Sequence, residues 1–158
     1  MKIYFVGSFD PPHIGHINTY KKACAKLDTQ VGIAICSNEL KNHPLLTLEE
    51  RAQLCRLVFE TNDIVICKNS IEIKQFVESC DIFIRGHRDQ LDEQYVQILA
   101  KYYKLENILE KVMYIPIDSE FLEVSSSKIK FLINNGGDFQ SFLPKVVYEY
   151  LKTMEKIW

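Results

Sequence analysis

The chain has 158 residues, of which 47% are hydrophobic and 25% are charged. This length and composition suit one compact domain, spanning residues 1–158, that buries a sizeable core. The formal net charge of -2 argues against a nucleic-acid-binding protein, because broad nucleic-acid surfaces need clustered Lys and Arg without compensating acids. Any anion-binding site is therefore expected to be local.

The apolar runs and the cysteines indicate the cellular compartment. No apolar run approaches the roughly 20 residues of a membrane span, and the first residues, MKIYFV, lack the longer apolar core and the cleavage site of a signal peptide. The five cysteines are an odd number, and no two of them form a CxxC motif. We therefore predict a cytoplasmic protein without membrane contact, whose cysteines are buried, reduced thiols.

Five short β-rich runs alternate with segments of helical character. The runs are nearly continuous in apolar residues, as expected of strands that are covered on both faces. They span residues 2–6, 31–36, 64–67, 82–85 and 112–115. Strands that alternate with helices predict right-handed crossovers, so the predicted fold class is α/β, a five-stranded parallel sheet with helices on both faces. Ligands of such sheets bind beyond the carboxyl ends of the strands.

The clearest helix is predicted from LDEQYVQILAKYYKL, residues 91–105. Its apolar side chains recur at helical spacing and would share one face: Leu91, Tyr95, Ile98, Leu99 and Tyr102. Tyr103 adjoins this stripe. An exposed subunit contact and a wide core-facing stripe account for it equally well, and both interpretations stay open.

Two further patterns mark helix ends. Thr47 and Glu50 have the spacing of a capping box, and local helix capping is the favoured interpretation of this segment. Arg51 follows them, but nothing local requires it to reach a phosphate. The sequence NNGGD, residues 134–138, predicts a helix stop followed by a turn.

The stretch GSFDPPHIGH, residues 7–16, follows the first predicted strand and runs into a helix predicted over residues 14–26. A helix start offers unpaired N–H groups and a partial positive charge, both of which attract phosphate. Gly7 would let the chain turn, and Gly15 would let a ligand approach the first helical turn without meeting a Cβ. The adjacent prolines stiffen the loop. The stretch therefore predicts a phosphate site.

His13 and His16 lie three residues apart, which places their side chains on one helix face if both are helical. A lone HxxH pair is weak evidence for metal, and we predict no metal site built from side chains. Within a Gly-Ser-Phe-Asp-Pro loop at a strand-to-helix turn, a functional role of these histidines is favoured over a structural one.

Two other segments are expected to reach the same edge of the sheet. Arg85 closes a predicted strand, and its planar guanidinium suits phosphate oxygens better than a lysine would. A salt-bridged strand end is the alternative. Ser125, Ser126 and Ser127 precede an apolar-periodic segment, residues 129–133, and so are good N-cap residues. Three hydroxyls together with a helix dipole favour an anion there.

The loop resembles a known family. Residues 7–11, GSFDP, followed by HIGH at 13–16, are similar to the (T/S)-x-(T/H)-x-G-H motif of the nucleotidyltransferase superfamily. Four other segments resemble those of phosphopantetheine adenylyltransferases in the same order: TLEER (47–51), RGHR (85–88), SSSKIK (125–130) and GDFQSFLP (137–144). The resemblance spans nearly the whole chain and implies a Rossmann-like domain. It also implies transfer of the adenylyl group of ATP to 4'-phosphopantetheine, with Mg2+, giving dephospho-CoA and pyrophosphate for coenzyme A biosynthesis, often in a homohexamer.

The same resemblance implies residue roles. His16 would contact the ATP phosphates in the transition state, and Ser8 with the Phe9 backbone would line the reacting-phosphate site. Lys41 is an approximate match for the lysine that binds the acceptor. The catalytic group would be Ser8, His16 and Arg85, and Ser8, Lys41 and Arg85 would bind the acceptor. The nucleotide would meet Gly7, Ser8, Phe9, His13, Gly15, His16, Arg85, Gly86, Arg88, Ser125, Ser126 and Ser127.

Several positions depart from the family pattern, and Val96 and His87 are two of them. Val96 stands where the family carries a glutamate near the nucleotide ribose, and valine cannot accept a hydrogen bond. His87 stands where leucine is usual. The alternatives are another transferase, one that makes NAD from a mononucleotide or joins CTP to an alcohol phosphate, or a catalytically weak nucleotide- or CoA-binding module.

A phosphate acceptor is already an oxyanion near neutral pH, since its second pKa is about 6. Transfer of a group to it therefore needs no general base.

Overall fold

Five parallel strands form the centre of the protein, whose computed structural model describes residues 1–41, 43–105 and 107–154. The strands are β1 Ile3–Gly7, β2 Gly32–Cys36, β3 Ile64–Cys67, β4 Ile82–His87 and β5 Val112–Pro116. They lie in the order β3-β2-β1-β4-β5, and every neighbouring pair is parallel. The prediction of a five-stranded parallel sheet is confirmed, and each predicted strand end lies within two residues of the observed one.

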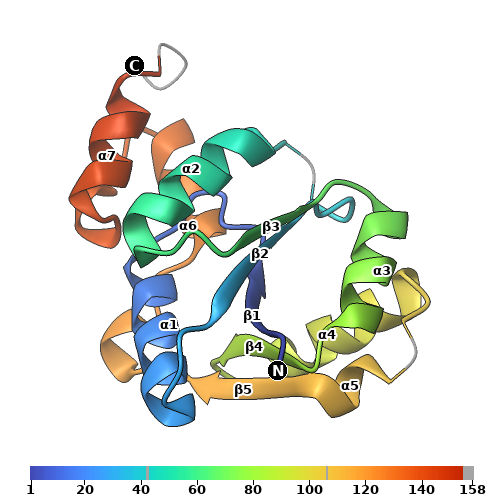
Figure 1. Ribbon diagram of the computed structural model, residues 1–158. Helices are drawn as coiled ribbons and strands as arrows, with labels where there is room; N and C mark the ends of the chain where they lie inside the picture. The colour runs from blue at the N-terminus through green and yellow to red at the C-terminus, as the bar shows by residue number, and fades with distance from the viewer. Residues whose placement is uncertain (42, 106, 155–158) are drawn as a thin grey trace.

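Helices cover both faces of this sheet (Figure 1). α1 (Ile14–Leu27) and α2 (Leu48–Phe59) pack on one face, and α3 (Ser70–Ser79) and α4 (Gln90–Tyr102) pack on the other. α6 (Ser126–Asn134) and α7 (Lys145–Lys152) lie beyond α2, away from the sheet. The short elements are α5 Ile108–Lys111 and the 3-10 turns η1 Ser119–Phe121 and η2 Gln140–Phe142. None of the described helices has the length and apolar character needed to cross a membrane.

Side chains that alternate along the strands pack into two hydrophobic cores, one on each face of the sheet. Phe5, Ile33 and Ile84 are each at most 3% exposed and pack under α1 and α2. Phe83 and Cys67 point to the opposite face and pack under α3 and α4. Because both faces are covered, polar residues have no place inside the strands, and this explains the nearly continuous apolar runs of the sequence.

The strand order fixes where a ligand can bind. The chain runs outward from β1 through β2 to β3, then returns to the other side of β1 to form β4 and β5. The crossovers therefore diverge between β1 and β4, which leaves a crevice at the carboxyl ends of these two strands. Ser8 follows β1 directly, and β4 ends with the Arg85-Gly86-His87 segment, so both motifs reach this crevice.

The buried face of α4 differs from the predicted one. Leu91 and Ile98 are 68% and 55% exposed, whereas Val96 and Tyr103 are 3% and 8% exposed. The face that packs on the sheet is therefore the one formed by Val96, Leu99 and Tyr103. Apolar residues occur on both sides of this helix, so periodicity alone could not select the side that meets the sheet. Of the two interpretations of Tyr103, the exposed subunit contact is wrong.

The predicted helix ends are confirmed. The Thr47 side chain accepts a hydrogen bond from the Glu50 amide at 3.2 Å, and the Glu50 carboxylate accepts one from the Thr47 amide at 2.7 Å. α6 ends at Asn134, and Gly136 adopts the left-handed backbone conformation with φ +67°. That conformation favours glycine because it has no Cβ.

Candidate active site

A pocket with a cavity volume of about 390 Å³ opens at the crevice between β1 and β4. Its mouth is lined by the loop after β1, by the first turns of α1 and α6, and by the end of β4. Its deeper part runs over the face of the sheet that α3 and α4 cover. Two helix N-termini therefore face one cavity, an arrangement that favours bound anions.

The loop after β1 is shaped by Phe9 more than by its glycines. Phe9 adopts the left-handed backbone conformation, with φ +46°, and its ring is fully buried. The ring lies so close to Gly7 that a Cβ there would stand 3.1 Å from it. The prediction that Gly7 supplies the turn is thus corrected: Gly7 makes room for the Phe9 ring, and Phe9 itself takes the unusual backbone angle. Such strain is typical of functional loops.

The two histidines form a mutual cap at the start of α1. The His16 amide donates to Nδ1 of His13 at 3.3 Å, and the His13 amide donates to Nδ1 of His16 at 3.2 Å. Their rings stack with centroids 3.6 Å apart. A Cβ on Gly15 would lie 3.1 Å from the His13 ring, so Gly15 is needed for this stack as well as for ligand approach. Because Nδ1 of each ring accepts, the proton of each neutral ring is on Nε2.

Burial keeps both histidines neutral. Desolvation, aided by the positive charge of Arg88, lowers the pKa of His13 to about 3. Desolvation also lowers the pKa of His16 well below its usual value, with His13 and the cations of Arg88, Arg85 and Lys41 acting in the same direction. His16 lines the pocket. Because its ring is neutral, it presents an N–H hydrogen-bond donor to the pocket and not a protonated imidazolium.

This burial predicts a loss of stability in mild acid. Below the unfolded pKa of about 6.5 the unfolded chain binds a proton at His13, whereas the folded chain does not until about pH 3. The free energy of unfolding should fall by about 1.4 kcal/mol per pH unit for this residue between those two values. Urea unfolding at pH 7.0, 6.0 and 5.0 measures it. His13→Asn keeps a good N-cap and should flatten the slope between pH 6 and 5, and an unchanged slope there would contradict the assignment.

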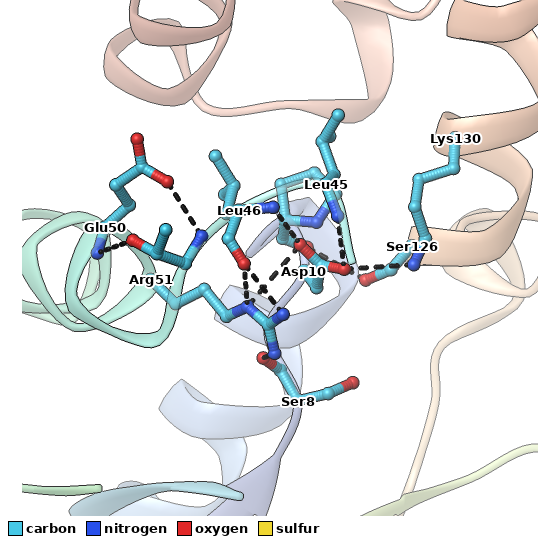
Figure 2. Close-up of polar contacts among 10 residues, drawn as sticks. Ser8, Asp10, Leu45, Leu46, Glu50, Arg51, Ser126 and Lys130 are labelled. Atoms are coloured by element: carbon cyan, nitrogen blue, oxygen red, sulfur yellow. Dashed lines mark hydrogen bonds and ion pairs between the residues drawn. The ribbon is translucent and has the colours of Figure 1, made fainter. Parts of the chain in front are cut away.

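Asp10 ties the loop to two distant segments. Its carboxylate accepts the Leu45 amide at 3.0 Å and the Leu46 amide at 2.8 Å, and it lies 3.0 Å from Nζ of Lys130. Nε of Arg51 stands 3.5 Å away. Figure 2 shows this carboxylate at the centre of the network. Asp10 is 3% exposed, so its negative charge is neutralised inside the protein and is not offered to the pocket.

Arg51 also has a structural role. Its guanidinium donates to the Leu46 carbonyl at 2.9 and 2.8 Å and to the Ser8 carbonyl at 3.2 Å. The side chain is buried and does not line the pocket. Its hydrogen bond from α2 holds the backbone of Ser8 in place (Figure 2). This structural role agrees with the interpretation of the TLEER segment as a local helix cap.

Three cations face the pocket. Arg85 donates to the Val6 carbonyl at 3.2 Å, and Arg88 donates to the Val124 carbonyl at 2.8 Å. Arg88 also lies 3.8 Å from the Asp92 carboxylate, whereas neither Arg85 nor Lys41 has an ion pair among the described residues. The alternative of a salt-bridged strand end at Arg85 is therefore wrong. An excess of positive charge at a cavity is suited to a polyanion.

Lys41 reaches this cluster from the loop after β2. Its ammonium lies 5.9 Å from the centre of the Tyr95 ring, on which Arg85 also packs at 5.9 Å. Desolvation and the charges of Lys130 and Arg85 lower the pKa of Lys41, while Asp10 acts in the opposite direction. The loop itself is tied to α4, because Asn38 donates a short hydrogen bond to the Tyr95 hydroxyl.

The three serines at the start of α6 are used differently. Ser125 caps the helix by accepting the Lys128 amide at 3.1 Å, and Ser126 donates to the Pro11 carbonyl at 2.9 Å. Among the described contacts the hydroxyl of Ser127 has no partner, and all three residues line the pocket. Ser125 and Ser126 therefore also hold the start of α6 in place, and the expectation that the three hydroxyls meet one anion stays a prediction.

The deeper part of the pocket was not predicted. Apolar side chains from α3, α4 and the sheet line it: Ile73, Phe76, Val77, Phe83, Leu99 and Tyr103. The Tyr103 hydroxyl is buried there and has no hydrogen-bond partner in the described structure. Local sequence reasoning missed these residues because each resembles an ordinary core residue, and only their common exposure to one cavity distinguishes them.

Val96 and His87, two of the departures from the family pattern, both lie near the site. Val96 is buried and forms part of the pocket wall, so the missing glutamate is missing from the cavity itself. His87 does not line the pocket. Its Nε2 lies 2.9 Å from the Glu93 carboxylate, and its ring packs on Tyr114. This pair holds the start of α4 against the end of β4.

The structure brings the predicted site residues together. All of them line the pocket except Phe9, whose ring is buried beside Phe5 and Phe59. No group of three metal-ligating side chains occurs in residues 1–41, 43–105 and 107–154. The roles of the pocket residues in binding and catalysis stay predictions.

The sequence is similar to those of known proteins. Residues 4–131 match the family described as cytidylyltransferase-like. The phosphopantetheine adenylyltransferase of Limosilactobacillus reuteri (strain DSM 20016) is 33% identical over 153 residues, which is 94% of this chain and 86% of the relative. The enzyme of that name from Lachnoclostridium phytofermentans is 30% identical over 157 residues, covering 96% and 94%. The one from Prochlorococcus marinus (strain MIT 9211) is 29% identical over 150 residues, covering 93% and 94%.

All residues that line the pocket fall inside the matched range, so the family match covers the whole candidate site. The chain belongs to the cytidylyltransferase-like family of nucleotidyltransferases. Within it, the chain groups with the phosphopantetheine adenylyltransferases, which it matches over nearly its whole length.

Proposed function

We propose that the protein transfers the adenylyl group of ATP to 4'-phosphopantetheine and releases dephospho-CoA and pyrophosphate. One observation carries this proposal: the pocket joins a cationic mouth to an apolar interior. The mouth suits two reacting phosphates, and the interior suits an uncharged, extended arm attached to one of them. The names of the relatives point to the same pair of substrates.

The reaction is an in-line displacement at phosphorus. An oxygen of the acceptor phosphate forms a bond to the α-phosphorus of ATP, while the bond from that phosphorus to the bridging oxygen of pyrophosphate breaks. The acceptor is deprotonated near neutral pH, so no side chain has to remove a proton. The protein has to align the groups and neutralise the charge that spreads onto the α-phosphoryl group and the leaving pyrophosphate.

The chain supplies the donors for this task. The Nε2–H of His16 and the hydroxyls of Ser8 and Ser127 face the pocket, together with the amides of two helix starts. Arg85 and Arg88 add positive charge at the pocket. Since the pKa of His16 is low, we assign it the role of a hydrogen-bond donor to the transferred phosphoryl group, not of an acid.

Mg2+ would act with the nucleotide, where it shields the charge of the triphosphate. The acidic side chains around the pocket are engaged already, since Asp10 binds amides and cations and Asp92 binds the Arg88 amide at 2.6 Å. The oxygens of the nucleotide phosphates are therefore expected to be the main ligands of the ion, with Ser8 and Ser127 as nearby oxygen donors.

Pyrophosphate release tests the proposal. Purified protein with Mg-ATP and 4'-phosphopantetheine should release pyrophosphate and form dephospho-CoA. Val96 in the pocket wall favours one competing function, a nucleotide- or CoA-binding module with weak catalysis. Nucleotide binding by calorimetry without pyrophosphate would support that module. Release only with nicotinamide mononucleotide, or only with CTP and an alcohol phosphate, would assign a different transferase.

Lys41→Ala should weaken acceptor binding more than ATP binding. The ammonium is at the pocket mouth without an ion pair in the described chain, and a lost charged hydrogen bond costs about 1.5–3 kcal/mol, or roughly 10- to 100-fold. Steady-state kinetics should show KM for 4'-phosphopantetheine rising by that factor. Lys21→Ala, an exposed lysine of α1, is the matched control. An equal rise of both KM values would remove Lys41 from the acceptor site.

We further infer a homo-oligomer, in line with the family resemblance. Leu91, Ile98 and Tyr102 form an exposed apolar stripe along α4, between 48% and 68% exposed. A stripe of this kind is commonly covered by a second subunit. Light scattering after size-exclusion chromatography measures the mass, and six times the chain mass is the expected value.

A further inference from the structure

Two cysteines end neighbouring strands at the edge of the pocket. Cys36 is the last residue of β2, Cys67 is the last residue of β3, and the two are register partners. Register partners on neighbouring strands are about 4.8 Å apart and project to the same face. That separation lies within the roughly 4.4–6.8 Å between Cα atoms that a disulfide spans. Both thiols join the apolar cluster under α3 and α4.

The two thiols also interact. The neighbouring Cys67 sulfur, together with burial, raises the pKa of the Cys36 thiol. Cys36 in turn lowers the pKa of Cys67, against the effect of desolvation. Cys67 is therefore the sulfur that more readily forms a thiolate, the attacking form in disulfide exchange, and this suits it for the second step of an exchange that begins at Cys36.

Only one of the pair meets the pocket. Cys36 is half-buried and lines the cavity, whereas Cys67 is 1% exposed and does not. A small reagent in the pocket therefore reaches Cys36 first, and Cys67 lies behind it as the second thiol. The remaining cysteine of this cluster, Cys80, is also buried and lies at the end of α3.

We propose that Cys36 and Cys67 form a reversible disulfide that lowers the affinity of the pocket for the acceptor, with a low-molecular-weight disulfide, RSSR, as the oxidant. The regulatory part rests on the proposed function. The Cys36 sulfur attacks one sulfur of RSSR as it loses its proton, forming Cys36–S–S–R and releasing RS⁻. The Cys67 thiolate then attacks the Cys36 sulfur and releases a second RS⁻. Two protein thiols are oxidised, RSSR is reduced to two thiols, and the two protons pass to them.

The expected loss of acceptor affinity follows from the segment attached to the ends of β2 and β3, which leads to Lys41. The Ser37 amide donates to the Cys67 carbonyl at 2.9 Å, and the Ser37 hydroxyl donates to the Lys68 carbonyl at 2.9 Å. The next residues turn back towards the pocket, where the Lys41 amide donates to the Asn38 carbonyl at 3.0 Å. The crosslink reorients the Cys36 side chain, which lines the pocket directly before this turn, and so displaces the Lys41 ammonium relative to Arg85.

Mass spectrometry of the intact protein and its peptides tests the crosslink. Native protein treated with bis(2-hydroxyethyl) disulfide should lose two thiols, yield a peptide pair joined through Cys36 and Cys67, and be restored by dithiothreitol. Cys67→Ala should stop at the mixed disulfide on Cys36. Cys24→Ala, on the opposite face of the sheet, should still form the crosslink. A crosslink to Cys80 instead, or none in the folded protein, would overturn the proposal.

Acceptor affinity tests the consequence. Calorimetry should show Kd for 4'-phosphopantetheine at least ten-fold higher for the oxidised protein than for the reduced protein, with a smaller change for ATP. Oxidised and reduced Cys24→Ala should differ as the wild type does. Equal acceptor affinities in the two redox states would refute the regulatory role. The crosslink is detected by mass and does not depend on activity. A failed pyrophosphate assay would therefore contradict the proposed function and leave the test of the disulfide unaffected.

Discussion

Replacing His16 by alanine is expected to lower kcat by about 10²- to 10³-fold, the usual effect of removing one donor to a developing oxyanion. The ring lines the pocket, its Nδ1 is occupied by the His13 amide, and its Nε2–H is left for the ligand. The ring is neutral, so the loss is that of a directed hydrogen bond. Single-turnover measurement of pyrophosphate release gives the rate of the chemical step.

Two variants separate chemistry from folding. His16→Gln keeps a side-chain N–H donor and should retain part of the rate that His16→Ala loses. His43→Asn, at an exposed loop position with a left-handed backbone, is the control that should leave turnover unchanged. Thermal melts by circular dichroism should show each variant folded. Turnover of His16→Ala within a few-fold of the wild type would remove His16 from the mechanism.

Asp10→Ala is expected to lower the free energy of unfolding by about 3–5 kcal/mol. The change leaves the buried Arg51 guanidinium without its carboxylate and deprives the Leu45 and Leu46 amides of their acceptor. It also releases Lys130, and with it one of the contacts between the loop after β1 and α6. A loss of this size is a large part of the 5–15 kcal/mol by which domains are usually stable.

Urea unfolding measures the effect, with Glu78→Ala as the matched acidic control. That change removes the exposed pair of Glu78 with Lys74, whose closest atoms are 3.9 Å apart, and should cost below about 0.5 kcal/mol. Asp10→Asn keeps one carbonyl oxygen for an amide but no charge, so its cost should lie between the two. If Asp10→Ala unfolded at the same urea concentration as Glu78→Ala, the network in Figure 2 would not be a stabilising one.

The comparison of α4 with β2 shows why some predictions succeed. The strand at residues 32–36 is apolar throughout because both sheet faces are covered, and this signal lies within five consecutive residues. The helix has apolar residues on two sides, and the choice between Leu91 and Tyr103 for burial depends on the sheet that lies beneath it. A pattern read along the chain contains no information about that partner.

The features of the site also fall into two groups, those that could be predicted from the sequence and those that could not. The HIGH segment, the capping box at Thr47 and the helix start at Ser125 were all recognisable, because helix ends depend on residues within one turn. The separate tasks of the three serines were not, because Ser126 bonds to Pro11, more than a hundred residues away in the chain. Neither was the apolar interior of the pocket, which is assembled from several elements.

The sequence by itself determined the strands, the helix ends and the position of the loop after β1, since apolar continuity, capping and prolines act over a few neighbouring residues. Only the tertiary structure decided that Asp10 holds Arg51 and Lys130 together, and that Cys36 stands beside Cys67 at the pocket. These pairings depend on the order of strands in the sheet and on the packing of α2 and α6 against the loop. Both are set by the burial of surfaces that lie far apart in the chain.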